Sequence, residues 1–462
     1  MALSAPISIA ATQTAWALAL LFWLLRLTVV RPRLAFDPMT VVVLIFVGLT
    51  LVSSTFSYEP EVSIRKMVAV SLVSIAYLVF AAIRREKDLR RIVASLLLAA
   101  VVTSLYAIGV TVVGRNLKVT EVDPAGMLAL AGVRANDTIV SINETAVASP
   151  QDLEAALHSI PSDAASKIRV YRLEAYYEYE IPAGAQRSNF GILNWSRGRD
   201  VRAAGFYGHY TTFAESLQLA ASLAFGLLIA VPYALGWRYR LAFAALVGSL
   251  AAALALTLTR ASWAGFAISG FVILLLGASK RAVIICVLLA IPVGVAGLVY
   301  LQQKRNVALV DANDGSTTWR TTVWSEAVRV IVDNPRHLLV GVGMDSIKTH
   351  WQEWRMFDNG RLPIGHMHST PLQFAFERGI PALIAWIVWI ALYFRMLWRA
   401  WRRTDVGWPE RGVVLGSLGG SVGFLASGLV HYNWGDSEVV MIFYLLTGLN
   451  IWIARRAEAV GV

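Results

Sequence analysis

Residues Ser95–Val113 read SLLLAAVVTSLYAIGVTVV and contain no charged side chain. A run of this length suits one helical crossing of a bilayer, and so does the uncharged stretch Ala282–Tyr300. Over all 462 residues, 57% are hydrophobic and only 15% are charged. A soluble globular protein has about 45–50% apolar and about 25% charged residues. The composition therefore excludes an ordinary soluble protein and predicts a polytopic membrane protein.

Hydropathy predicts about eleven α-helical spans, in three groups separated by two polar intervals. The first apolar run is too long for a cleaved signal and lacks a preceding basic segment, so we expect it to stay in the membrane. The predicted spans lie near residues 9–30, 38–54, 67–83, 92–113, 211–235, 241–258, 262–278, 282–301, 372–396, 411–431 and 438–455.

The distribution of lysine and arginine predicts the orientation of these spans. Basic clusters occupy every second loop, which the positive-inside rule assigns to the cytoplasm. The long polar intervals 114–210 and 302–371 then face the periplasm of a bacterial inner membrane. The same rule explains the net charge of +11 without a nucleic-acid partner. The clusters are Arg31 and Arg33; Arg84, Arg85, Lys87, Arg90 and Arg91; Arg238 and Arg240; Lys280 and Arg281; Arg395, Arg399, Arg402 and Arg403; Arg455 and Arg456.

The first polar interval contains a segment, residues 116–184, with the pattern of a small α+β domain. Polar and apolar residues alternate in Leu117–Val122, Thr138–Ile142 and Lys167–Leu173, as in half-buried strands. Ser149 can cap a helix over Pro150–His158, which has proline in its first turn.

In this segment VTEVDPAGMLALAGV, NDTIVSINETAV and SPQDLEAAL follow one another in an order that resembles a bacterial PDZ domain. The departures from the family pattern, Asn136-Asp137 and Asn143-Glu144, fall in turns. The resemblance implies that an extended peptide or C-terminus adds a strand to a sheet edge. It places the peptide-binding loop at Gly114, Arg115, Asn116 and Leu117. A rigid spacer without a peptide ligand is the alternative.

Several polar motifs lie at or near the outer ends of the spans. Arginine is unexpected there, because the positive-inside rule places basic residues on the cytoplasmic side. The order and spacing of these motifs resemble the O-antigen ligase and polymerase superfamily of membrane proteins. Ser369 departs from the family, which usually has asparagine there, and so does the PDZ-like insert. The matching residues are Arg202, Gly205 and Phe206; Thr257, Thr259, Arg260 and Ser262; Arg320 and Trp324; Pro335, Gly341 and Gly343; His366 and His368; Leu372 and Gln373; and Glu377-Arg378-Gly379-Ile380.

These interpretations divide the chain into five parts around one inserted domain. The predicted fold class is an all-α polytopic membrane protein of about eleven transmembrane helices with a small α+β PDZ-like insert. The parts are residues 1–113 (N-terminal transmembrane helices), 116–184 (PDZ-like domain), 185–301 (central transmembrane helices), 302–371 (periplasmic catalytic loop) and 372–462 (C-terminal transmembrane helices).

The resemblance implies transfer of a glycan from a polyprenyl diphosphate carrier to an acceptor hydroxyl on a glycan, a lipid such as a lipopolysaccharide core, or a protein. Histidine suits the base because its pKa lies near neutrality, and arginine suits the diphosphate because its fork binds phosphate bidentately. We expect His368 to be the base and His366 to position the acceptor.

Three arginines, Arg202, Arg260 and Arg320, are expected to hold the diphosphate. Glu377 and Asp436 could orient these groups. Direct attack by the acceptor would invert the anomeric carbon. The diphosphate is a good leaving group and no Asp-x-Asp pattern is present, so we expect neither a metal nor another cofactor.

Three other classes of protein compete with this interpretation. A site-2-type protease also combines a PDZ domain with spans, but it requires H-E-x-x-H and the chain has no His-Glu pair. A transporter or flippase of lipid-linked glycans, or a non-catalytic scaffold that uses its PDZ domain, remains open. Ligase and polymerase share a donor and differ in their acceptor, so the sequence does not separate them.

Overall fold

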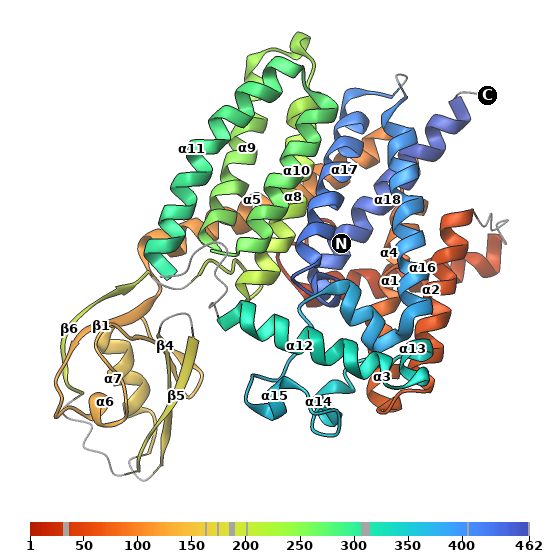
Figure 1. The fold of residues 1–462 in the computed structure, drawn as a ribbon. Coiled ribbons are helices and arrows are strands. Elements are labelled where there is room, and N and C mark those ends of the chain that lie inside the picture. Colours follow the sequence, from red (N-terminus) through yellow and green to blue (C-terminus); the bar gives the residue numbers. More distant parts are fainter. Residues whose placement is uncertain are drawn as a thin grey trace. The chain divides into compact units, whose positions relative to one another are not determined.

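The structure is a computed structural model that describes residues 1–30, 37–161, 164–172, 175–183, 190–199, 202–305, 315–403 and 406–460. Two compact units divide the chain: Met1–Ser104 with Ala204–Val462, and Leu105–Ala203. The first unit is helical, and the second contains the sheet (Figure 1). Arg31 and Arg33 of the first predicted basic loop lie outside the described residues.

Long apolar helices make up most of the chain. Among the described residues, ten helical segments are long and apolar enough to cross a membrane, which confirms the predicted multi-pass membrane protein. α2 shows how such a helix begins: the Asp37 side chain accepts a hydrogen bond from Thr40 N, and Pro38 opens the first turn. The ten segments are α1 Ile9–Val30, α2 Pro38–Thr55, the pair α3 Pro60–Ser71 and α4 Ser74–Ala82, α5 Glu86–Val113, α8 Tyr210–Ala230, α9 Trp237–Leu256, α10 Arg260–Gly277, α11 Lys280–Arg305, α16 Thr370–Trp401 and α18 Ser437–Val460.

The span predicted near 411–431 is α17, Trp408–Gly428, a helix rich in glycine and serine that does not belong to the ten. Its glycines allow unusually close packing. A Cβ at Gly416 would meet the backbone of Leu223 on α8, and one at Gly423 would meet the backbone of Gly265 on α10. Small residues that bring helix backbones together are typical of packing within membranes. α17 is therefore a buried helix at the centre of the bundle.

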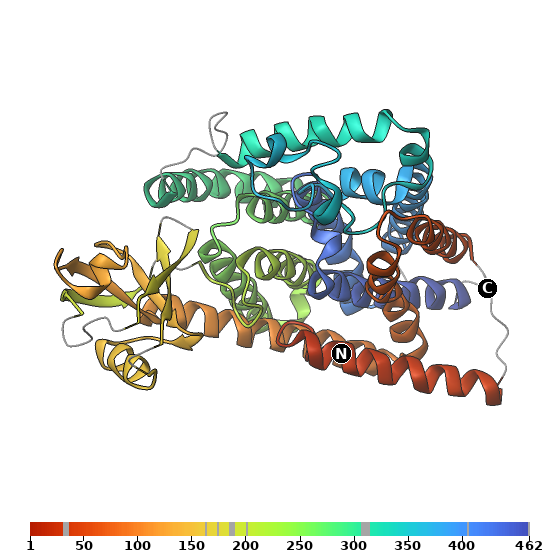
Figure 2. The ribbon, with the colours of Figure 1, turned by 90° about the horizontal axis from the view of Figure 1, so that it is seen from below.

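Most of the second predicted outer interval is helical. α12, Gly315–Val332, lies crosswise to the long helices (Figures 1 and 2). Val323, Ala327 and Val330 recur at helical spacing and bury one face of α12 in a core shared with Phe376 of α16. Short elements complete this outer layer and the connections: α13 Pro335–Val340, α14 Ile347–His350, α15 Phe357–Gly360, η1 Tyr233–Leu235 and η2 Asn433–Gly435.

The second unit contains the inserted domain, an antiparallel sheet of strand order β5-β4-β2-β1-β6 with β3 paired to β2. The helix predicted from Ser149 is present, and Ser149 Oγ accepts a hydrogen bond from Asp152 N at 3.2 Å. The last strand, β6, lies beyond residue 184, the predicted end of the domain. The elements are β1 Asn116–Val122, α6 Met127–Leu130, β2 Thr138–Ile142, β3 Thr145–Ala146, α7 Pro150–His158, β4 Ser166–Arg172, β5 Ala175–Ile181 and β6 Ile192–Gly198.

Candidate active site

Both predicted site histidines lie in the loop that leads into α16. Met367, between them, is buried and anchors this loop, because its N–H donates to Gln373 Oε1 at 2.7 Å and its carbonyl accepts from Trp324 Nε1 at 2.7 Å. The rings of His366 and His368 lie 4.2 Å apart, centroid to centroid. His368 N donates to His366 Nδ1 at 3.2 Å, so a neutral His366 carries its ring proton on Nε2. The loop therefore presents two imidazoles as one cluster.

The surroundings of this cluster keep both imidazoles neutral. The Trp319 ring meets the His368 ring edge-on at 4.8 Å, and its indole N–H donates to Pro363 O at 3.0 Å. Burial, followed by repulsion from His366, His431 and Arg320, lowers the pKa of His368 to about 3. His366 is exposed on one side, yet the protein around it and the nearby His431 lower its pKa to about 4. Both rings are therefore uncharged at neutral pH.

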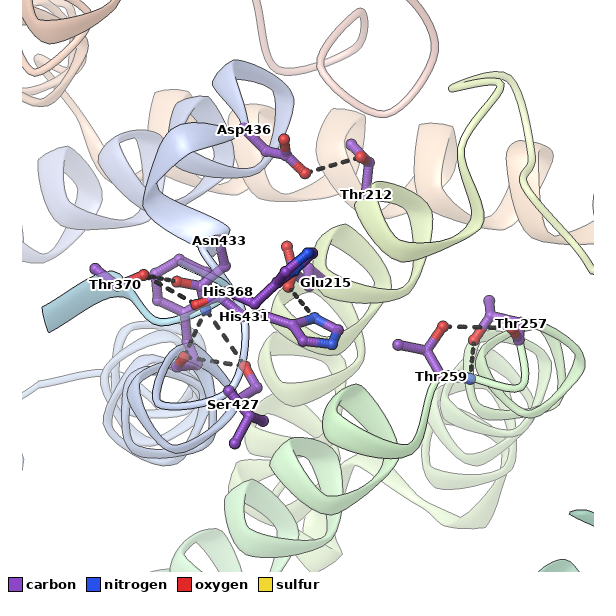
Figure 3. Close-up of polar contacts among 12 residues, drawn as sticks. Thr212, Glu215, Thr257, Thr259, His368, Thr370, Ser427, His431, Asn433 and Asp436 are labelled. Carbon is purple, nitrogen blue, oxygen red and sulfur yellow. Dashed lines mark hydrogen bonds and ion pairs between the residues drawn. The ribbon is translucent and has the colours of Figure 1, made fainter. Parts of the chain in front are cut away.

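A third imidazole, that of His431, lies in the same site and is not among the site residues predicted from the sequence. Its Nδ1 lies 2.9 Å from Oε1 of Glu215, a carboxylate of α8 that is 1% exposed (Figure 3). Burial and the charge of Arg320 lower the pKa of His431 to about 4. One signal could have found this pair, because an ionisable residue such as Glu215 inside an apolar span marks a functional position.

Hydrogen bonds connect the His431 loop to the start of α16. Thr370 N donates to His431 O at 3.1 Å, and Thr370 Oγ1 donates to Asn433 Oδ1 at 2.9 Å. The Asn433 amide in turn donates to Phe424 O of α17 at 2.7 Å. Thr370 lies two residues after His368, so these bonds bring the loops before α16 and before α18 together (Figure 3).

Two of the three predicted diphosphate arginines converge on one serine. Arg320 Nη1 donates to Ser316 Oγ at 2.9 Å, and Arg260 Nη2 lies 3.4 Å from the same oxygen. Arg320 Nε also donates to Val430 O at 3.2 Å, one residue before His431. The start of α10, the start of α12 and the histidine loops thus meet. Arg202 belongs to the other compact unit, so its position relative to the histidines is not described.

Of the two predicted orienting carboxylates, Glu377 forms hydrogen bonds with main-chain groups. Its Oε1 accepts from Asp345 N at 3.0 Å, and its main-chain oxygen accepts from Gly343 N at 2.9 Å and from Ser53 Oγ at 2.8 Å. Gly341 and Gly343 have positive φ angles, and any Cβ at Gly341 would collide with the Glu377 backbone. Glu377 therefore stabilises the glycine turn of the family motif and forms no hydrogen bond with either predicted histidine among the described contacts.

Asp436 lies beside the start of α8, where its Oδ2 accepts from Thr212 Oγ1 at 2.8 Å (Figure 3). Burial, followed by the negative charge of Glu215, raises the pKa of Asp436 to about 7. This carboxyl group thus shares its electrostatic environment with the Glu215–His431 pair. Among the described residues, no group of three or more histidine, cysteine or acidic side chains is placed to hold a metal ion.

The pairing of β1 corrects the predicted peptide-binding loop of the inserted domain. Asn116 and Leu117 are buried in β1, which pairs with β2 on one side and β6 on the other. Gly114 and Arg115 precede it, and Arg115 N already donates to Gly198 O of β6 at 3.2 Å. An interior strand has no free edge, so an added strand has no place at Asn116–Leu117.

Of the two strands that end the sheet order, β6 exposes an apolar pair. Leu193 is 62% exposed and Trp195 is 40% exposed on one face of this strand. Phe190 and Ile192 pack against the core of the domain. β6 therefore combines a sheet edge with apolar contact surface, and the sequence missed it because it lies in the interval assigned to the transmembrane helices.

Comparison with known proteins agrees with both predicted resemblances. Residues 244–387 match the family model of O-antigen ligase, and residues 118–172 match a PDZ domain model. A curated relative, the probable periplasmic serine endoprotease DegP-like of Halomonas elongata, is 44% identical over 66 residues. That match covers 14% of this chain and 14% of the relative, so the chain spans only a small part of the relative's length.

Proposed function

We propose that this protein is a membrane glycosyltransferase of the O-antigen ligase or polymerase type, which transfers a glycan from a polyprenyl diphosphate carrier to an acceptor hydroxyl. One observation carries the proposal: the imidazoles of the two histidine loops and the guanidinium groups of Arg260 and Arg320 lie together at one side of the bundle. Arg260, Arg320, His366 and His368 all fall within the segment that matches O-antigen ligase. The combination of base and fixed cations is what this transfer needs.

In the proposed reaction, neutral His368 accepts the proton of the acceptor hydroxyl. The acceptor oxygen attacks the anomeric carbon as the bond from that carbon to the diphosphate oxygen breaks. The diphosphate leaves with the bonding electrons, and Arg260 and Arg320 hold its negative charge. A single displacement inverts the anomeric carbon. The arginines supply the positive charge that a metal supplies elsewhere, so the proposed transfer runs without one.

Glu215 and His431 act in this proposal as positioning residues. The Glu215 carboxyl group contacts Nδ1 of His431 at 2.9 Å and so leaves Nε2 as the ring nitrogen that Glu215 does not engage. His431 then adds to the cluster an imidazole of fixed orientation next to the His366 loop. A buried carboxylate that orients a histidine in this way is a recurring device of acid–base sites.

The proposal places the site on the periplasmic side of a bacterial inner membrane, since the basic loops lie on the other side. The PDZ domain would bind an extended peptide along β6, where main-chain groups give affinity and the face of Leu193 and Trp195 gives selectivity. Such a peptide would come from an acceptor protein or from a partner in envelope polysaccharide assembly.

The test is the glycan profile of membranes from cells that carry His368→Ala, compared with wild type at equal protein level. We expect ligated or polymerised glycan to disappear and the carrier-linked precursor to accumulate outside the cytoplasm. His158→Ala is the matched control, because His158 is an exposed residue of α7 whose only described ion pair is to Glu154 on the surface.

An unchanged profile for His368→Ala would remove His368 as the base. Precursor that accumulates inside the cell would instead favour a transporter of lipid-linked glycan. A wild-type profile in the His158→Ala strain is required before either result is interpreted.

A further inference from the structure

A cavity of about 400 Å³ lies between three helix ends, away from the candidate active site. It is formed where α2 begins and where α16 and α18 approach their C-terminal ends. The histidine loops lie at the opposite ends, since α16 begins at Thr370 and α18 begins at Ser437. The cavity therefore occupies the other side of the bundle, at the depth where spans end and lipid headgroups lie.

Four arginines line this cavity. Arg395 and Arg399 lie four residues apart on one face of α16, and Arg403 follows just beyond the C-terminal end of this helix. Arg455 of α18 completes the set, and its guanidinium is fixed by Asp37 at 2.6 Å and by the Phe80 ring at 5.0 Å. Among the described residues that line the cavity, Asp37 is the one carboxylate, and this ion pair already engages it.

Arg395 and Arg399 carry like charges at i, i+4 spacing, which destabilises a helix. With Arg403 beside them, they concentrate positive potential in a concave, partly apolar site. Among the described residues, none of the three forms an ion pair with a carboxylate. A general excess of cytoplasmic arginine does not require this convergence, because exposed arginines such as Arg402 satisfy the positive-inside tendency equally well. The concentrated positive charge makes this cavity suited to an anion.

The remaining lining indicates which anion fits. Met39, Leu392, Met396 and Ile451 provide apolar surface beside the guanidinium groups. A free phosphate ion gains nothing from such surface, whereas a phospholipid has both a phosphate and acyl chains. We propose that this cavity binds the phosphate of an anionic phospholipid headgroup. Basic pockets between transmembrane helices at the cytoplasmic surface are suited to such headgroups.

The test uses the full-length protein reconstituted in mixed bilayers of phosphatidylcholine and phosphatidylglycerol, followed by native mass spectrometry of the retained lipid. Wild type should retain phosphatidylglycerol in preference to phosphatidylcholine. The triple variant Arg395→Gln, Arg399→Gln, Arg403→Gln should lose about 10-fold or more of that preference, given the contribution of each basic residue. Arg402→Gln, at the same helix end but outside the cavity lining, should change it by less than about twofold.

A second arm adds millimolar inorganic phosphate to the wild-type protein. Retention of phosphatidylglycerol in its presence supports the lipid as the ligand, whereas displacement would assign the site to a soluble phosphate and overturn the lipid proposal. Equal retention by wild type and the triple variant, or no preference over phosphatidylcholine, would also overturn it. If the triple variant does not remain monodisperse, the single variant Arg399→Glu takes its place. No readout depends on glycan transfer, so this inference and the proposed function fail independently.

Discussion

Replacing Trp319 by alanine should move the acid limb of the pH–rate profile of glycan transfer toward neutral pH. The Trp319 ring covers His368 edge-on at 4.8 Å and contributes to the burial that lowers the pKa of His368 to about 3. A solvated histidine has a pKa of about 6.5. Water admitted by the smaller side chain stabilises the imidazolium and therefore raises the pKa of His368 toward that value.

The magnitude follows from the two limiting pKa values. At about pH 5.5, a base with a pKa near 3 is almost entirely neutral, whereas one with a pKa of about 6.5 is only about 10% neutral. Wild-type kcat/KM should therefore be nearly level between about pH 7.5 and 5.5. For Trp319→Ala it should fall by up to about tenfold over this interval, because the rate follows the neutral fraction of the base.

The assay is initial-rate transfer with purified full-length protein in detergent, using a lipid-linked donor and varying pH. Donor binding brings negative charge next to the histidines and so raises their pKa. The acid limb of kcat should consequently lie at higher pH than that of kcat/KM, which reports the free enzyme.

His158→Ala, on the surface of α7, controls for effects of pH on the preparation. A wild-type kcat/KM that falls about tenfold between about pH 7.5 and 5.5 would refute the argument, since it would mean that the base is an unperturbed histidine. If the acid limb of kcat/KM lies at the same pH in wild type and in Trp319→Ala, Trp319 does not control the burial of His368.

Three further predictions follow from the same packing. Glu215→Gln should lower kcat by about 100-fold with little change in KM, because the buried Glu215 side chain orients His431 and lies too deep to contact the substrate. An increase in KM without a fall in kcat would contradict this role. Arg320→Lys should lower kcat/KM by about tenfold, because lysine keeps the charge but loses the planar guanidinium that donates to Ser316 and Val430. Equal rates of wild type and variant over a range of donor concentrations would exclude bidentate binding of the diphosphate by Arg320. Gly423→Ala should lower the free energy of unfolding by about 1–3 kcal/mol, because the added methyl group overpacks α17 against α10. Gly248→Ala is the control, since no atom lies within 4 Å of its added Cβ. Equal melting temperatures of the two variants in detergent would argue against close packing of α17.

Local features of this sequence predict much of the fold. Uncharged runs long enough to cross a bilayer give the spans, and the period of two gives β2 at Thr138–Ile142 as observed. Ser149 and Pro150 mark the start of α7 because capping depends on adjacent residues only. The order of the outer motifs also identified His366, His368, Arg260 and Arg320, which the structure brings to one side of the bundle.

Other features depend on residues distant in sequence, and no local pattern reports them. The edge position of β6 arises only when Ile192–Gly198 pairs with β1, 70 or more residues earlier, and the sequence of one strand does not reveal its partner. Hydropathy predicts the span that becomes α17, but its close approach to α8 and α10 is set by contacts of Gly416 and Gly423 with helices distant in sequence.

The sequence by itself thus determined that the chain spans a membrane, carries a PDZ domain and places basic and imidazole groups at span ends, because hydropathy, periodicity and motif order are properties of contiguous residues. Only the tertiary structure decided that His431 meets Glu215 across 216 positions and that Arg260 and Arg320 share Ser316. These contacts form when helices far apart in the chain pack side by side, and helix packing is set by the shapes of whole surfaces. The site is therefore a product of packing, although most of its chemical groups are visible in the sequence.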